Sequence, residues 1–283
     1  MRVCSALLSL ILAVAFTNGT GASAAELSAT DILDRMIDQS RLTSENKQSR
    51  WHACRRITTV EELAASGGVA SRKSREQRMV SSNGVETLRL IKVNGEPVKV
   101  SGKKRNGGKE PESEGDEDWK KEPDQKERPR KDREGSKKGK NGRGEIDEAL
   151  LRRFNYQRSG EEIIEGRTNY VLSFSPKPVG SDADMMSRMV SLLNGRIWVD
   201  STAFELTRVD AHLIKSFDIF GGIAASIQRL NFAIERMPLK EGVWETRSMR
   251  TELQGRKFLS SMRMRILMDQ DEFETLQPSK IAP

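Results

Sequence analysis

Cysteine is nearly absent from this sequence of 283 residues, which contains only Cys4 and Cys54. Cys4 lies in an N-terminal segment that we expect to be removed, so Cys54 would have no partner for an internal disulfide. A fold without bridges has to be held by its core, and we interpret Cys54 as a small buried apolar residue, not as a redox thiol. No lipobox places a cysteine at the expected cleavage point, which argues against a lipid anchor.

Motifs of common enzymes and metal sites are also missing. The two histidines, His52 and His212, both fall in expected strands, where a structural role on a strand face is the simpler interpretation. No G-x-S-x-G, H-E-x-x-H, P-loop or dinucleotide-binding glycine pattern occurs. Asp182 and Asp184 could suggest metal ligands, but two acids in the first turn of a helix are explained by the helix dipole. We therefore expect no enzyme, no metal and no cofactor.

Long apolar runs are lacking except near the N-terminus. Arg2 gives a positive start, residues 6–16 form an apolar core, and Ala22-Ser23-Ala24 is a small-x-small cleavage signal. That core is shorter than the roughly 20 apolar residues that a membrane-spanning helix needs. A buried helix is the weaker alternative, because the run has no polar face. The pattern predicts that residues 1–24 are a signal peptide cleaved near Ala24, and that the mature protein is periplasmic and not membrane-anchored.

Much of the charge is gathered in one tract. Residues 101–145 hold fifteen Lys or Arg and twelve Asp or Glu, with Trp119 as their only apolar side chain. Such a composition cannot bury enough surface to offset the entropy of ordering, so we expect a disordered insertion or at most a frayed helix. Its acids and its lack of aromatics speak against a nucleic-acid partner. The tract interrupts what we interpret as one domain at 25–283.

Two helices are predicted from capping signals. The first follows Ser28 or Thr30 as cap, with Asp31 in its dipole-positive first turn. The second is expected at residues 182–193 with Ser181 as its cap.

Extended patterns recur along the chain, at residues 51–60, 86–93, 97–100, 170–174, 197–200, 204–213 and 258–268. The Asn94-Gly95 pair between two of them is typical of a hairpin turn. The last segment alternates most regularly, which indicates a sheet with one buried face. The predicted fold class is mainly β (α+β), an open antiparallel half-barrel with short helices over its concave face.

The order of several motifs resembles a known family. They are GRTNYVL at 166–172, GRIWVD at 195–200, FELTRVD at 204–210 and GVWETR at 242–247, followed by the final alternating strand. This order is similar to the periplasmic lipoprotein-carrier superfamily that includes LolA, LolB and the RseB/MucB sensors. The N-terminal block, from WHACRR at 51–56 to the strand before Asn94-Gly95, looks like exported members without an assigned function. The resemblance implies an open half-barrel, and transport of lipoproteins follows from it only as an analogy of fold.

A cavity between the helices and the sheet is the expected site. Its apolar lining is predicted to be Met185, Met186, Met189, Leu193, Phe258, Met262, Met264, Ile266 and Met268. Flexible thioethers adapt to irregular ligands, although the same side chains could simply fill a core. A mobile lip is expected at Phe217, Phe220, Gly221 and Gly222, with an ordinary buried turn as the alternative.

The leading hypothesis is a soluble, non-enzymatic periplasmic protein that binds lipid or the acyl chains of a lipoprotein for transport or sensing. The alternative is an envelope scaffold in which residues 101–145 contact anionic lipid, glycan or another protein. Neither hypothesis fixes the oligomeric state.

Overall fold

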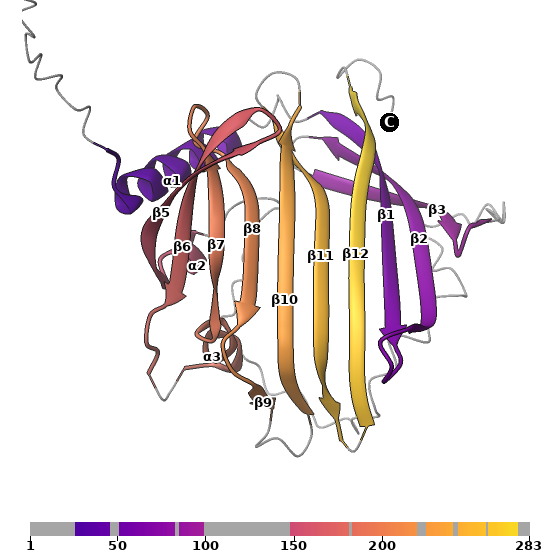
Figure 1. Cartoon of the computed structure of the whole chain (residues 1–283). Helices are drawn as coiled ribbons and strands as arrows, with labels where there is room; N and C mark the ends of the chain where they lie inside the picture. The colour runs from indigo at the N-terminus through magenta and orange to yellow at the C-terminus, as the bar shows by residue number, and fades with distance from the viewer. Residues whose placement is uncertain are drawn as a thin grey trace, which may run out of the picture.

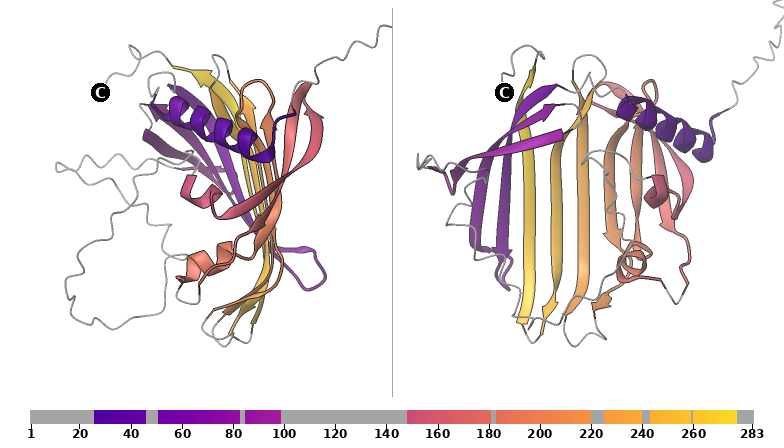
Figure 2. Two further views of the ribbon diagram at one scale, coloured as in Figure 1. Left: turned by 90° about the vertical axis from the view of Figure 1, so that its left-hand side faces the viewer. Right: turned by 180° about the vertical axis from the view of Figure 1, so that it is seen from behind.

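The computed structural model describes residues 26–45, 51–82, 85–98, 148–180, 183–219, 225–239, 243–258 and 260–276. They form one large antiparallel sheet with helices on one of its faces (Figures 1 and 2). The helices are α1 (Ala29–Glu45), α2 (Glu148–Leu151) and α3 (Met185–Val190). The strands are β1 (His52–Leu63), β2 (Val69–Ser82), β3 (Val85–Val93), β4 (Glu96–Pro97), β5 (Phe154–Ile164), β6 (Arg167–Pro176), β7 (Leu193–Asp200), β8 (Leu206–Leu213), β9 (Phe217–Ile219), β10 (Ala225–Pro238), β11 (Trp244–Lys257) and β12 (Ser260–Thr275).

The sheet is open, with β4 at one edge and β5 at the other. Across it the order is β4-β3-β2-β1-β12-β11-β10-β8-β7-β6-β5, with β9 beside β10. All pairings between the described strands are antiparallel, and β1 pairs with β12, so the first and last strands of the chain meet inside the sheet. The predicted fold class is confirmed.

Ser28 caps α1. Its hydroxyl oxygen accepts a hydrogen bond from the N–H of Asp31 at 3.1 Å, and its own N–H donates to the Asp31 carboxylate, also at 3.1 Å. These reciprocal bonds satisfy donors that a helix start leaves free. The Ser28 hydroxyl and N–H also hold the pKa of Asp31 below its usual value. The prediction of a helix start here is confirmed, with Ser28 as the cap.

The predicted helix at 182–193 is wrong in its extent. Only Met185–Val190 are helical, and the cap is Asp184, whose carboxylate accepts from the N–H of Ser187 at 2.9 Å and from its hydroxyl at 2.7 Å. The segment from Leu193 onward is already strand β7. The Ser181 cap lies outside the described residues, as does Asp182. Pairing with β6 and β8 therefore outweighs the helical periodicity at the C-terminal end of the segment.

The predicted strands agree with the structure except at some ends. β8 begins at Leu206, not at Phe204, because Phe204 has φ 51° and its N–H donates to the carbonyl of Asp200 at 3.0 Å in a tight turn. The predicted hairpin turn is confirmed, since Asn94 and Gly95 have φ 50° and 85°, both in the left-handed region. β4 is only two residues long, and residues 99–100 lie outside the described part.

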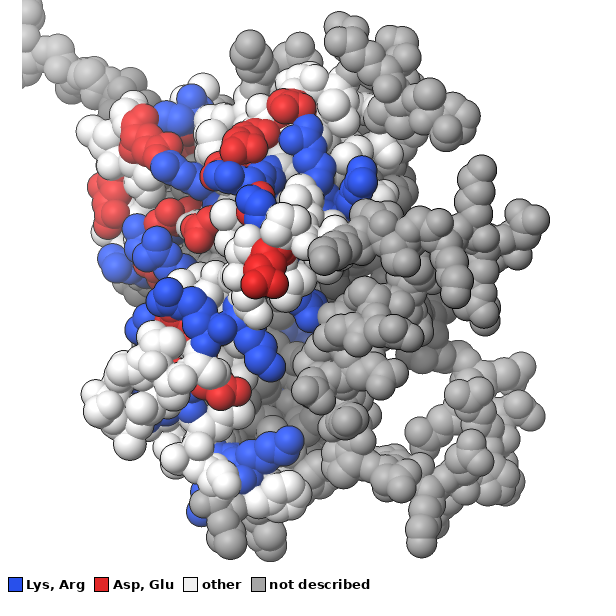
Figure 3. Space-filling view, turned by 90° about the vertical axis from the view of Figure 1, so that its right-hand side faces the viewer, with Lys and Arg blue, Asp and Glu red and all other residues white. Residues whose placement is uncertain are grey.

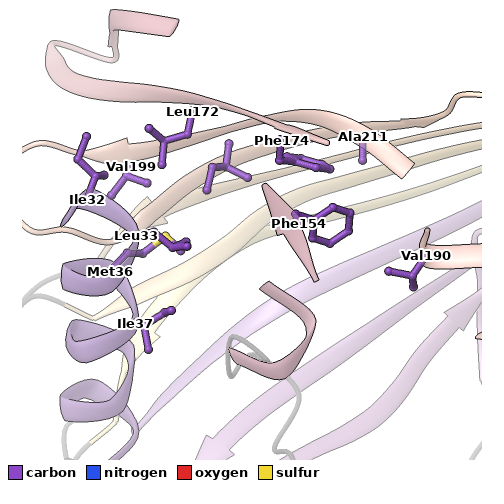
Figure 4. Packing of buried hydrophobic residues seen from close by; sticks show 11 residues of the cluster. Ile32, Leu33, Met36, Ile37, Phe154, Leu172, Phe174, Val190, Val199 and Ala211 are labelled. Atoms are coloured by element: carbon purple, nitrogen blue, oxygen red, sulfur yellow. The ribbon is translucent and has the colours of Figure 1, made fainter. Parts of the chain in front are cut away.

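The buried core lies on one half of the concave face. Four α1 side chains, Ile32, Leu33, Met36 and Ile37, are at most 7 % exposed and point towards β5–β8 (Figure 4). Their partners on the strands and on α3 are Phe154, Leu172, Phe174, Val190, Ile197, Val199 and Ala211. This cluster fixes α1 over the β5–β8 half of the sheet.

The outer, convex face carries charges and one large aromatic. Trp198 is 2 % exposed, and its indole N–H donates to the Glu162 carboxylate at 2.9 Å. The guanidinium carbons of Arg196 and Arg208 lie 5.0 and 4.9 Å from its ring centroid. Farther along the sheet the same face has cross-strand ion pairs, such as Arg55 with Asp271 at 2.6 Å. This face is therefore covered by polar groups.

Candidate functional site

Apolar side chains continue along the concave face beyond the buried core. The core residue Ala211 pairs with Phe232 on β10, and two residues on, Ile234 pairs with Met249 on β11. Met249 in turn pairs with Met268 on β12. Directly opposed residues in an antiparallel sheet share a face, so this row lies on the helix-covered side. We call the full set the concave strip: Val60, Leu230, Phe232, Ile234, Met249, Leu253, Met262, Met264, Ile266 and Met268.

The concave strip is only half-buried. Each of its side chains is intermediate in exposure, whereas the neighbouring core on β5–β8 is at most 9 % exposed. Among the described residues, only Phe232 of the strip packs against that core. Figure 2 shows α1, α2 and α3 on this side of the sheet, gathered over its β5–β8 half. The strip is thus an apolar surface beside a filled core.

The predicted lining residues fall into separate groups. Met262, Met264, Ile266 and Met268 lie together in the concave strip. On α3, Met185 and Met186 are exposed, and Met189 is half-buried. The other two predicted lining residues differ from each other: Leu193 packs against the buried core, and Phe258 is 60 % exposed at the turn between β11 and β12.

The predicted lip is only partly within the described residues. Phe217 is buried in the short strand β9, beside β10. Phe220, Gly221 and Gly222 lie outside the described residues, so the lip stays a prediction.

Sequence reasoning missed the members of the strip on β10 and β11. Leu230, Phe232 and Ile234 alternate with polar or small residues, as do Met249 and Leu253. This period of two is the same signal that revealed β12. The strands were overlooked because their apolar rows are shorter than that of β12: the row of β10 ends at Arg236, and the row of β11 is broken by Thr251 and Gly255.

A polar cluster lies on the same face next to the strip, towards the start of β1. Arg56 pairs with Gln270 in the sheet register, and its guanidinium lies 3.4 Å from the carboxylate of Glu86. With its side-chain amide oriented to accept, Gln270 receives hydrogen bonds from Nε of Arg56 at 3.1 Å and from Nη2 at 3.0 Å. The Arg56 charge is therefore met within the protein, so this end of the strip does not offer a free cation to a ligand.

Cys54 lies beside this cluster and is fully buried, as predicted. Burial raises the pKa of its thiol to about 11, which outweighs the opposing effect of Arg56. We expect Cys54 of the folded protein, expressed without residues 1–24, to react with a disulfide reagent at pH 8 only as fast as the fold opens. In urea, where the usual pKa near 8.5 returns, the reaction should be rapid. Fast labelling of the folded protein would contradict this assignment.

The two histidines lie in strands, as predicted: His52 in β1 and His212 in β8. His52 is buried, with Nε2 3.3 Å from a carboxylate oxygen of Glu245. In the part of the chain that the structure describes, no group of three or more His, Cys, Asp or Glu side chains is arranged to hold a metal ion. Within the same part, every helix is too short or too polar to cross a membrane.

No protein-family model and no curated protein matches the chain by sequence. Among solved structures it is similar to a LolA superfamily protein from Nitrosomonas europaea, with 12 % identity, 90 % of this chain and 97 % of that chain covered, and a TM-score of 0.33. It is also similar to a putative outer membrane lipoprotein-sorting protein domain from Vibrio parahaemolyticus, with 9 % identity, coverage of 86 % and 94 %, and a TM-score of 0.32. A third match is the MucA/MucB complex of Pseudomonas aeruginosa, with 9 % identity, coverage of 86 % and 94 %, and a TM-score of 0.24. These matches are a likeness of fold at low sequence identity.

Proposed function

We propose that this chain is an exported, non-enzymatic protein that binds an acyl chain of a lipid or lipoprotein along the concave strip, for transport or sensing. The observation that carries the proposal is the half-burial of the strip beside a fully buried core on the same face. If the strip only completed the core, its side chains would be buried like those under α1. Their partial exposure leaves apolar surface for a ligand.

The chemistry of the strip suits a flexible hydrocarbon. Four of its members are methionines, Met249, Met262, Met264 and Met268, whose unbranched thioethers adapt to an irregular partner. Each methylene of an acyl chain that leaves water gains about 0.8 kcal/mol, so a long chain could be held without polar recognition. The satisfied Arg56 cluster beside the strip fits a site that recognises the chain and not a charged head group.

Two neighbouring residues of β12 give a matched test, because they lie on opposite faces. Ile266 belongs to the concave strip, whereas Leu267 pairs with Arg250 on the convex side, and both are half-buried. Ile266→Gln should weaken the binding of a fluorescent fatty acid about four- to twelvefold, since roughly half of the 1.5–3 kcal/mol of a buried aliphatic side chain is lost. Leu267→Gln should leave binding unchanged. Titration with the fluorescent probe measures the affinity of each variant. Native mass spectrometry of protein purified from the periplasm detects any bound lipid.

Equal loss in the two variants, or no bound lipid and no probe binding in the parent protein, would overturn the proposal. The scaffold alternative depends on residues 101–145, which lie outside the described residues and stay a prediction from the sequence. Deleting that tract separates the two ideas. A carrier keeps its affinity for the probe, while a scaffold loses its partner.

A further inference from the structure

The two ends of the strands differ sharply in charge. We call one end the basic rim, formed by the described residues of 63–69, 177–192, 213–219, 225–229 and 255–263. It holds seven Lys or Arg residues and two Asp residues. One of the two, Asp184, is the N-terminal cap of α3. The basic residues are Lys177, Arg188, Lys215, Arg229, Arg256, Lys257 and Arg263.

The opposite end of the strands is acidic. It comprises the described residues of 51–54, 80–86, 161–168, 199–206, 238–246 and 270–276, which hold ten Asp or Glu and a single Arg. Most of these acids form ion pairs with arginines, several of them from the next positions of the strands, as in Arg55–Asp271, Arg236–Glu205 and Arg247–Glu165. Figure 3 views the molecule from the β1–β3 side, and its lowest described atoms are blue and white, while most red atoms lie higher. Arginines thus balance most acids of that end, whereas on the basic rim seven basic residues stand against two Asp, so the rim carries the unbalanced positive charge.

The basic rim also gathers exposed apolar side chains. Eleven large apolar residues are exposed among those described, and six of them lie on this rim. They are Val69, Val179, Met185, Met186, Ile214 and Phe258. On the surface of a soluble protein, exposed large apolar residues are usually scattered singly. Their clustering among Lys and Arg residues therefore needs an explanation.

Phe258 is the clearest of these residues. It is 60 % exposed and has φ 53° at the turn between β11 and β12, a backbone conformation that Gly or Asn adopts at less cost. An exposed aromatic at a strained turn contributes little to the fold. Its neighbour Lys257 is exposed as well, so the tip of this hairpin presents an apolar and a cationic group together.

We propose that the basic rim docks on the surface of an anionic lipid bilayer. Basic side chains are attracted to acidic head groups, and apolar ones enter the boundary between head groups and acyl chains. A soluble polyanion would meet the charges but would give the exposed Phe258, Met185 and Met186 no apolar environment. The combination of both kinds of side chain on one rim favours the bilayer.

Docking would also place the concave strip at the membrane, and this step rests on the proposed function. Met262 belongs both to the concave strip and to the basic rim, since it pairs with Gly255 close to the β11–β12 turn. The other end of the strip is bordered by the satisfied Arg56 cluster. An acyl chain would therefore enter or leave beside Met262, directly at the docked surface.

Flotation with lipid vesicles tests the docking without any ligand in the strip. The protein should float with vesicles of phosphatidylcholine and phosphatidylglycerol at low salt, and not with phosphatidylcholine alone or at high salt. Lys215→Glu with Lys257→Glu should weaken binding at least about 25-fold, because each basic side chain near the surface contributes about fivefold. Phe258→Asn, which suits the turn, should weaken binding about tenfold with no loss of thermal stability.

Matched controls lie away from the basic rim. Ile163→Ser removes an exposed apolar side chain at the acidic end, and Arg89→Glu reverses an exposed charge on β3. Both should bind vesicles like the parent protein. Three results would overturn the proposal: equal binding to neutral and anionic vesicles, binding to neither kind, or the same loss of binding in the control variants. Binding to a soluble polyanion with an affinity that Phe258→Asn does not change would also overturn it. These failures would leave binding in the strip untouched, because probe titration measures it separately.

Discussion

Gly195→Ala should destabilise the protein by about 3 kcal/mol or more, because β7 and β8 leave no room for a side chain at this point. An ideal Cβ on Gly195 would lie 1.9 Å from the carbonyl oxygen of Asp210 and 2.9 Å from Cα of Ala211. Both atoms belong to the backbone of β8, so they cannot move aside without shifting the strand. Ala211 is also part of the core under α1. Urea unfolding followed by circular dichroism measures the change.

Gly68→Ala provides the control for this prediction. Gly68 lies in the turn between β1 and β2, and the nearest atom to an added Cβ is the Ser66 hydroxyl oxygen at 3.8 Å, an ordinary contact. This variant should differ from the parent by no more than about 0.5 kcal/mol. If the two variants unfold at the same urea concentration, then the close approach of β7 and β8 is not rigid.

Trp198→Ala should lower the free energy of unfolding by about 3–5 kcal/mol. The change empties a buried site on the convex face and leaves the Glu162 carboxylate without the indole N–H that it accepts from at 2.9 Å. It also removes the ring beside which Arg196 and Arg208 lie. The measurement is again urea unfolding, followed by circular dichroism because the substitution removes a fluorophore.

Trp198→Phe separates the ring from its hydrogen bond. Phenylalanine keeps most of the apolar volume but cannot donate to Glu162, so a smaller loss of about 1–2 kcal/mol is expected. A Trp198→Ala protein as stable as Trp198→Phe would show that the aromatic ring is not needed on this face. Because Trp198 is on the opposite side of the sheet from the concave strip, probe binding by the folded Phe variant should be unaffected.

The sequence predicted the strands with the most regular apolar alternation and missed those in which the apolar row is short or absent. β6 and β12 show regular alternation, and their existence was evident. β2 reads VASRKSREQRMVSS and β5 reads FNYQRSGEEII, and neither has an apolar row long enough to stand out. They are strands because they pair with β1 and β6. Such pairing is a tertiary interaction, which the periodicity of the local sequence does not reveal.

The candidate site shows the same limit of local periodicity. The methionine row of β12 was visible because alternate residues share a face, whatever the partners of the strand. The assignment of Met185 and Met186 to the cavity assumed that α3 would extend to Leu193 and lie flat on the sheet. The actual helix is two turns at most, and these two side chains are exposed on it. The direction of a short helix depends on its flanking turns, which the apolar pattern does not specify.

The position of α1 has a mechanical consequence. α1 packs over β5–β8, yet residues 46–51 are all that separate it from β1, which pairs with β12 in the other half of the sheet. A link of this length can span at most roughly 25 Å, so it limits how far apart the two halves can move on the concave side. Through α1 and β1, residues 26–63 therefore contact both halves of the open sheet. This covalent limit holds whatever occupies the concave strip.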